Sequence, residues 1–103
     1  MGSIAREVVY GQRPGEPRFA ITIEIGTPYP YQDKSDEWAC PFALTGVYDT
    51  CHDVHGSSAL QVLGLAVALA YNLLRAFQDE GTLSYEDGSP YDLDATFGRS
   101  LIA

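Results

Sequence analysis

The longest apolar pattern in the chain runs over residues 56–81 and predicts one long helix. Good helix formers fill residues 59–80. The polar and small positions that step by three or four residues form one thin stripe: Gln61, Gly64, Ala68, Asn72, Arg75 and Asp79. Because the rest of the circumference is apolar, we expect the helix to have neighbours on more than one side.

Both ends of this helix carry sequence signals. Ser58 is expected to cap the first turn, and the side chain of Gln61, three residues later, can reach back to the Ser58 amide. Gly81 is expected to end the helix in the left-handed conformation. These signals predict a helix over residues 59–80.

A membrane span is the competing interpretation of the same stretch. Residues 56–74 carry no charge and are nearly long enough to cross a bilayer. The stretch also contains Gln61, Gly64 and Asn72, and Arg75 follows at once. Inserting these residues into a bilayer is costly, so we predict a soluble protein without membrane association.

Two alternating patterns near the start of the chain predict an antiparallel hairpin. Residues 4–11 alternate, and residues 18–26 alternate more clearly. Residues 12–17 between them are rich in proline and glycine, as turns are. The apolar face of the second strand consists of Phe19, Ile21, Ile23 and Ile25. This face requires a cover, and the long helix can supply it.

Residues 38–47 predict a third strand. Pro41 lacks a backbone donor, so this strand should lie at a sheet edge or carry a bulge. Residues 27–37 before it are expected to form a loop. Tyr29 and Tyr31 in that loop form either a small recognition surface or an aromatic cover for the hairpin edge.

After the helix, residues 82–85 and 91–93 flank a turn at residues 86–90. This pattern predicts a short C-terminal β-hairpin or an extended tail. Together the elements predict a single α+β domain over residues 1–103, in which a three-stranded antiparallel meander packs against one long helix.

Two stretches resemble a family of small uncharacterised bacterial proteins. The segment Trp-Ala-Cys-Pro-Phe begins at Trp38, and Gly-Ser-Ser-Ala-Leu-Gln-Val-Leu begins at Gly56. In that family a Trp-x-Cys-Pro-Phe strand precedes a helix that starts Gly-x-Asp-Ser-Leu-Gln-Ala-Leu. This chain has Ser58 and Ala59 where the family has Asp-Ser. The resemblance implies a bacterial strand-strand-strand-helix domain and transfers no activity.

The strongest chemical cluster combines Cys40, Cys51, His52 and His55. Cysteine and histidine are zinc-ligand types, and a nearby acid and histidine can activate a thiol. However, the spacing matches no compact zinc motif, and Cys40 lies in the strand pattern where a small buried side chain is expected. We therefore expect no catalytic residue, metal or cofactor, with a small enzyme or metal-binding protein using this cluster as the alternative.

The chain carries fourteen acidic and six basic side chains, which give a net charge of −8. This balance argues against nucleic-acid binding, which requires a basic surface. The acidic residues gather after the helix, where they either meet a basic protein partner or keep the surface soluble. The first residues lack the apolar core of a signal peptide, so we expect a cytoplasmic protein.

Leu65, Leu69 and Leu73 flank the polar stripe of the long helix, where a three-stranded sheet would leave them uncovered. Such a row is rare on a soluble monomer, so it predicts a homodimer with these leucines at the interface. The rival cover is the C-terminal segment, whose Leu93 and Phe97 can fold back over the same row.

These observations predict a small acidic association module without catalytic activity. The sharpest form of this prediction is an immunity- or antitoxin-like protein that blocks a basic partner.

Overall fold

The first two strands form a long antiparallel hairpin, as the alternating patterns predict. β1 (Ser3–Gln12) pairs with β2 (Phe19–Gly26) along almost its whole length. The structure is a computed structural model that describes residues 2–32, 36–48 and 53–99. Ile21, Ile23 and Ile25 of β2 are buried, which confirms the apolar face of this strand.

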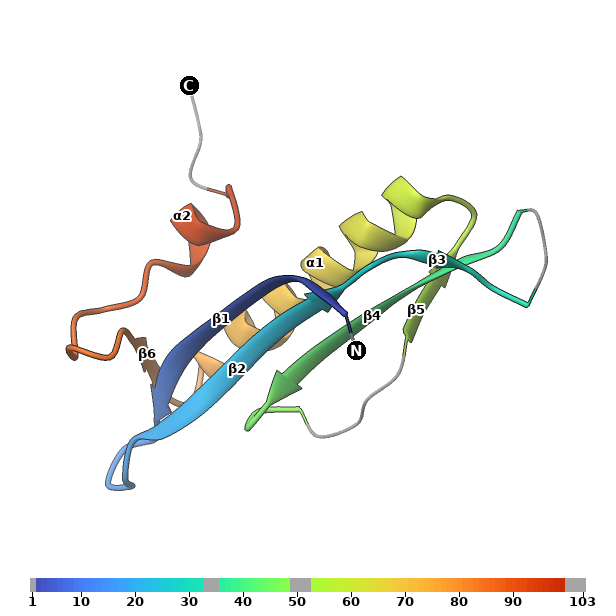
Figure 1. The fold of residues 1–103 in the computed structure, drawn as a ribbon. Coiled ribbons are helices and arrows are strands. Elements are labelled where there is room, and N and C mark those ends of the chain that lie inside the picture. Colours follow the sequence, from blue (N-terminus) through green and yellow to red (C-terminus); the bar gives the residue numbers. More distant parts are fainter. Residues whose placement is uncertain (1, 33–35, 49–52, 100–103) are drawn as a thin grey trace.

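Four further strands complete a curled, six-stranded antiparallel sheet (Figure 1). β3 (Tyr29–Pro30) and β5 (Asp53–Gly56) pair with the first half of β4 (Trp38–Thr45), and β2 pairs with its second half. β6 (Thr82–Ser84) pairs with the end of β1. The α+β class is confirmed, but the three-stranded meander is wrong, because strands of two to four residues are too short to show a period in the sequence.

Pro41 lies inside the sheet, next to a bulge. On one side of Pro41, Ile25 pairs with Phe42, and on the other side Tyr29 pairs with Ala39. Between these two pairs the β2–β3 side therefore has one residue more than β4. This bulge interrupts the hydrogen-bond ladder where proline has no donor. Of the two predicted settings for Pro41, a sheet edge or a bulge, the bulge is therefore the one that agrees with the pairing.

The long helix α1 (Ala59–Phe77) packs across one face of the sheet (Figure 1). Its buried residues are Val62, Ala66, Ala70, Tyr71, Leu74 and Phe77. They contact buried residues from three strands, namely Val9, Ile21, Ile23, Ile25, Cys40, Phe42 and Leu44. Phe19 is half-buried at one end of this core, where its ring meets the Phe77 ring edge-on at 5.8 Å. The predicted packing of the helix against the isoleucine face of β2 is confirmed.

The two ends of α1 differ in how well the sequence predicts them. Ser58 is the N-cap, and its hydroxyl accepts a hydrogen bond from the Gln61 amide at 3.0 Å. The Gln61 side chain reaches back to the Ser57 amide rather than to that of Ser58. Gly81 does not end the helix: α1 stops at Phe77, and the φ angle of Gly81 is not in the left-handed region. A side chain at Gly81 would instead meet the Gln12 carbonyl and the Phe77 ring, so close packing requires this glycine.

Ser58→Ala is expected to lower the free energy of unfolding by about 1 kcal/mol, because the Gln61 amide loses its hydrogen-bond acceptor. Urea titration followed by circular dichroism measures this change. Ser57→Ala is the matched control, since the Ser57 hydroxyl contacts only the Gln61 side chain. A larger loss for Ser57→Ala than for Ser58→Ala would contradict the assignment of the cap.

The segment after α1 forms the predicted short hairpin and then returns to α1. Ser84 pairs with Pro90, the Tyr85 amide donates to the Ser89 carbonyl at 2.8 Å, and the Tyr91 amide donates to the Leu83 carbonyl at 3.1 Å. The chain then forms the short helix α2 (Leu93–Thr96), which lies beside α1. The Tyr71 hydroxyl donates a hydrogen bond to the Asp94 carboxylate at 2.5 Å, so the tail is fastened to the long helix.

Candidate functional site

Of the cysteine and histidine cluster, the structure describes Cys40 and His55, and Cys51 and His52 lie outside the described residues. Cys40 is fully buried, and its thiol donates a weak hydrogen bond to the Gly26 carbonyl at 3.4 Å. Burial raises the pKa of the Cys40 thiol, and the Asp53 carboxylate raises it further. A buried thiol with a raised pKa is a poor nucleophile, so Cys40 is structural.

The sheet separates Cys40 from His55. Ala39 of β4 pairs with His55 of β5, and Cys40 pairs with Val54, so the two side chains project from opposite faces. In the part of the chain that the structure describes, no group of three or more His, Cys, Asp or Glu side chains could hold a metal ion.

Polar side chains on the outer face tie the short strands together around β4. The Tyr29 hydroxyl donates a hydrogen bond to the Asp53 carboxylate, which, with some burial, raises the pKa of Tyr29 to about 12. The Tyr31 ring meets the His55 ring edge-on at 4.6 Å. His55 Nδ1 lies 3.6 Å from a Glu37 carboxylate oxygen. Because these groups are occupied with one another, the arrangement supports a structural role better than a recognition surface.

The predicted leucine row lies along one flank of α1. Leu65 is 43% exposed, whereas Leu69 and Leu73 are half-buried against the core. Leu60, on another side of the helix, is 80% exposed. By length and composition alone α1 could cross a membrane, and only 33% of its most apolar window is buried. Its buried face packs on the sheet, and much of its apolar surface remains uncovered by the described residues.

The C-terminal segment covers the other flank of α1. Phe97 contacts the Tyr71 ring at 5.8 Å between centroids. Tyr71 lies two residues after Leu69, which is about 200° around the helix. Phe97 therefore lies on the flank opposite the leucine row, so the prediction that Phe97 covers this row is wrong.

A second surface, which the sequence did not reveal, lies along the first half of β1. β6 pairs with β1 only from Tyr10 to Gln12. Within residues 2–32, 36–48 and 53–99, nothing pairs with residues 3–9 on that side of the sheet (Figure 1). Ile4 is 52% exposed and Val8 37% exposed on the outer face of this edge. We call residues 3–9 of β1 the open edge.

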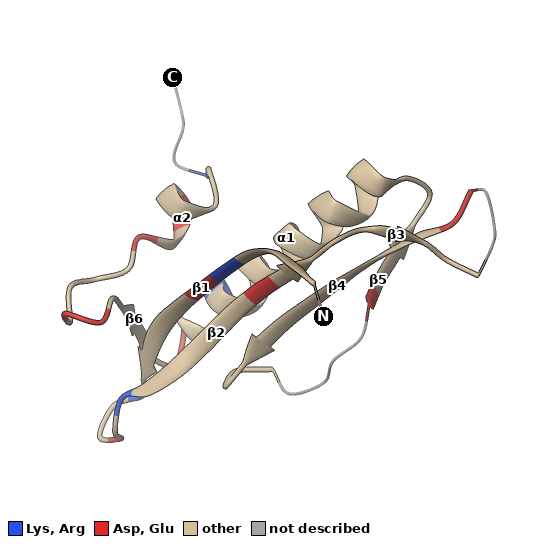
Figure 2. Cartoon of the chain, viewed as in Figure 1, with Lys and Arg blue, Asp and Glu red and all other residues tan. Residues whose placement is uncertain are grey.

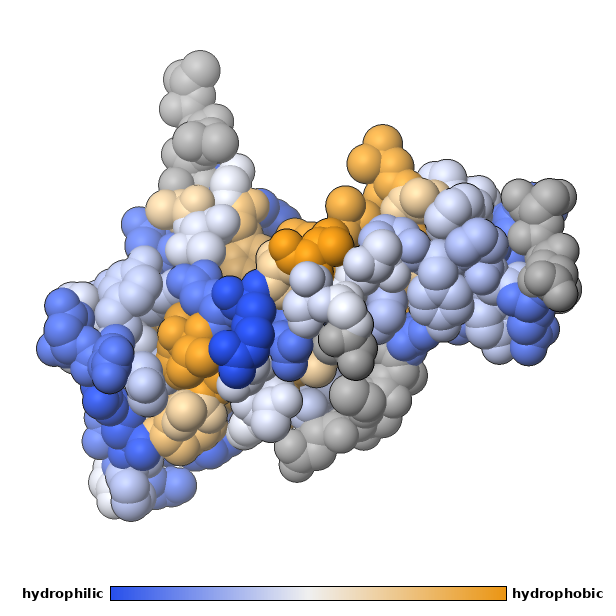
Figure 3. Space-filling model, in the orientation of Figure 1, coloured by the Kyte–Doolittle hydropathy of each residue, from blue (hydrophilic) through white to orange (hydrophobic). Residues whose placement is uncertain are grey.

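An apolar groove of about 300 Å³ lies beneath the open edge. Ile23 and Ile25 form its floor, Val67 of α1 forms one wall, and Phe97 after α2 forms the other. Ala5, Arg6 and Glu7 of the open edge also line the groove, together with Thr96 of α2. Figure 3 shows apolar surface between β1 and the helices on this side of the molecule. We call this hollow the β1 groove.

The C-terminal segment marks one end of the open edge. Tyr91 is buried, and its hydroxyl donates a hydrogen bond to the Glu7 carboxylate at 3.3 Å. Burial is the main cause that raises the pKa of Tyr91 to about 12, and the Glu7 charge adds to it. Glu7 is half-buried, and it lines the groove at the point where Tyr91 reaches it.

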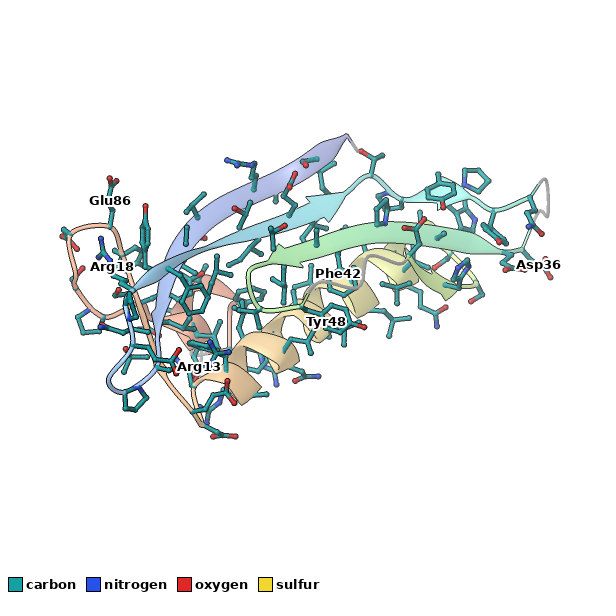
Figure 4. All side chains as sticks on the ribbon, turned by 90° about the horizontal axis from the view of Figure 1, so that it is seen from below. Arg13, Arg18, Asp36, Phe42, Tyr48 and Glu86 are labelled. Atoms are coloured by element: carbon teal, nitrogen blue, oxygen red, sulfur yellow. The ribbon has the colours of Figure 1, made fainter. Side chains whose placement is uncertain are left out.

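Figure 2 shows where the charged residues lie along the ribbon, and two arginines at the β1–β2 turn make contacts within their own chain. Arg13 pairs with Glu80 at 2.9 Å and also lies over the Phe77 ring. Arg18 donates to the Glu86 carbonyl at 3.0 Å, and Figure 4 shows it pointing from the β1–β2 turn toward that loop. Since the chain carries fourteen acidic and six basic side chains, its net charge of −8 makes the molecule negative as a whole.

A scan against protein-family models and searches of the curated proteins and the solved structures returned no match. The function proposed below therefore rests on the surfaces of this chain alone.

Sequence reasoning found the leucine row but missed the open edge and the β1 groove. The one available signal was the pattern of residues 4–11, which places large or charged side chains on both faces of a strand at the start of the chain. That pattern does not say which neighbour a strand lacks, because pairing is decided by distant segments.

Proposed function

We propose that this protein is a non-catalytic association module, which forms a homodimer through the leucine row and binds a basic protein partner. The observation that carries the proposal is the uncovered flank of α1. Leu65 is exposed beside the half-buried Leu69 and Leu73, and the C-terminal segment occupies the opposite flank. Twofold association is the commonest way for a small soluble protein to bury such a row.

The charge distribution supports the second part of the proposal. The net charge is −8, and the described arginines other than Arg6 are held by contacts within their own chain. Long-range attraction toward a basic surface would increase the rate of association with such a partner. An inhibitor of the immunity or antitoxin type would use these properties. No observation within the described residues favours the alternative of a metal- or thiol-dependent enzyme.

Light scattering coupled to size exclusion tests the dimer. We expect a mass near twice the 11.2 kDa of one chain at micromolar concentration. Leu65→Glu is expected to shift the mass to that of one chain, because the interface would bury a carboxylate without a partner. Since Leu65 is exposed in the single chain, this substitution leaves the core intact.

Leu60→Glu is the matched control, because Leu60 is more exposed and lies outside the leucine row. It is expected to leave the dimer unchanged. A wild-type mass near 11.2 kDa would reject the dimer. Dissociation by Leu60→Glu but not by Leu65→Glu would place the interface elsewhere on α1.

A further inference from the structure

We propose that the open edge of β1 accepts an extended segment of the protein partner as an added antiparallel strand, with one apolar side chain of that segment in the β1 groove. This inference rests on the proposed function and names the binding site that the association module uses for its partner. The leucine row lies on the flank of α1 away from this site, so dimer formation and strand addition are compatible.

The first step is the unpaired backbone. A register shift between Ser3 and Ala5 interrupts the start of the edge, so its regular part is residues 5–9, which span roughly 17 Å at 3.3 Å per residue. Such an edge presents a row of unpaired N–H and C=O groups, and proteins usually shorten, cover or charge their edges. Here no described strand pairs with residues 3–9 on that side, although the Tyr91 hydroxyl reaches the Glu7 carboxylate. Main-chain hydrogen bonds to an added strand would satisfy these groups.

The second step is the groove beneath the backbone. Ala5 faces the groove side of β1, and its small side chain leaves the space between Ile25, Val67 and Phe97 empty. In an added antiparallel strand, the residue opposite Ala5 points to the same face, with its Cβ atom about 5 Å away. An apolar side chain at that position would enter the groove and remove water from its walls.

The third step is the charge pattern along the edge. Glu7 pairs with the buried Ile23 and Arg6 pairs with Glu24, so Glu7 lies on the core face and Arg6 on the outer face, although both residues line the rim of the groove. Opposite charges that face each other across a strand pair are stabilising, and like charges are destabilising. The edge therefore selects a segment with an acidic residue opposite Arg6 and a basic residue opposite Glu7.

The same charges disfavour a second copy of this chain as the occupant. A twofold antiparallel pairing that overlaps the whole edge places Arg6 opposite Arg6. The register one pair further along places Glu7 opposite Glu7. Both arrangements bring like charges together, so these two registers, which overlap the edge most fully, are disfavoured for a second copy, whereas a complementary segment of another protein can use them.

Fluorescence polarisation with designed peptides tests the proposal on the intact chain. The probe is labelled Thr-Val-Lys-Glu-Leu-Val-Thr, in which Leu lies opposite Ala5, Glu opposite Arg6 and Lys opposite Glu7. The control peptide Thr-Val-Glu-Lys-Leu-Val-Thr has the same composition with the two charges exchanged. We expect the probe to bind at least about threefold tighter than the control.

Two further comparisons distinguish strand addition from nonspecific peptide binding. The double variant Arg6→Glu, Glu7→Lys is expected to reverse the preference between the two peptides. Two N-methylated forms of the probe carry methyl groups on alternate amides: one form on the amides that face β1, the other on the amides that face away from it. The first form should lose binding and the second should keep it, because only alternate amides face β1. Thermal melting of the double variant checks that it is folded.

Each outcome decides the question. Absence of binding at millimolar concentration, equal binding of probe and control, or equal loss from both N-methylated forms would overturn strand addition at this edge. Light scattering on the same samples keeps the proposed function distinct. A dimer that binds no peptide rejects the docking site alone, and a monomer that binds the probe rejects the dimer alone.

Discussion

Ile23→Asp is expected to unfold the domain in dilute buffer. Ile23 is 6% exposed and lies in the core between β2 and α1. A carboxylate at this position would be surrounded by apolar side chains without a partner, and burying an unpaired charge costs several kcal/mol. Since domains of this size are stable by about 5–15 kcal/mol, this loss removes most of the stability. Circular dichroism and a thermal melt provide the measurement.

Ala20→Asp is the matched control for this prediction. Ala20 lies on the same strand but is exposed on its outer face, so the added charge remains in water. We expect its melting temperature to stay close to that of the wild type. A cooperative melt of Ile23→Asp within about two degrees of wild type would show that this side chain is not in the core.

Gly46→Ala is expected to lower the free energy of unfolding by about 2–5 kcal/mol. Gly46 has a φ angle of +108°, a conformation that residues with a Cβ atom rarely adopt. An added Cβ atom would lie 2.7 Å from the Ala20 carbonyl oxygen, which is backbone and cannot rotate away. The strain and the clash therefore add, and the turn after β4 would have to move away from β2. Denaturant titration measures the loss.

Gly64→Ala is the control, since a Cβ atom at Gly64 meets nothing within 4 Å. Gly64 lies on the exposed side of α1, where alanine is a better helix former, so we expect a gain of about 1 kcal/mol. The same chemical change should thus have opposite signs at the two glycines. Equal stability of Gly46→Ala and wild type would contradict the strained conformation at position 46.

The candidate site illustrates which parts of a surface local sequence can predict. The leucine row was predictable, because a helix fixes the angle between successive side chains and Leu65, Leu69 and Leu73 must lie on one flank. The open edge was not predictable, because it is defined by what fails to pair with residues 3–9. β6 lies about 70 residues away from β1 in the chain and covers only three of its residues.

The cysteine and histidine cluster shows the opposite case, in which proximity in the sequence misleads. Cys40 and His55 lie on neighbouring strands, yet the pleat directs them to opposite faces of the sheet. No spacing rule predicts this outcome, because it depends on the register between β4 and β5. Cys51 and His52 lie outside the described residues, so the structure bears on two members of the cluster.

The sequence by itself determined the elements that depend on local physics. The alternation of residues 18–26, the Ser58 cap and the apolar periodicity of residues 59–77 act within one or two turns or strand repeats, and the structure confirms each of them. Only the tertiary structure decided the other features: the strands β3 and β5, the pairing of β6 with β1, the end of α1 before Gly81, the return of the tail to Tyr71 and the open edge above the β1 groove. Each of these depends on contacts between segments far apart in the chain, and such contacts arise from the shape of the assembled core rather than from any local pattern.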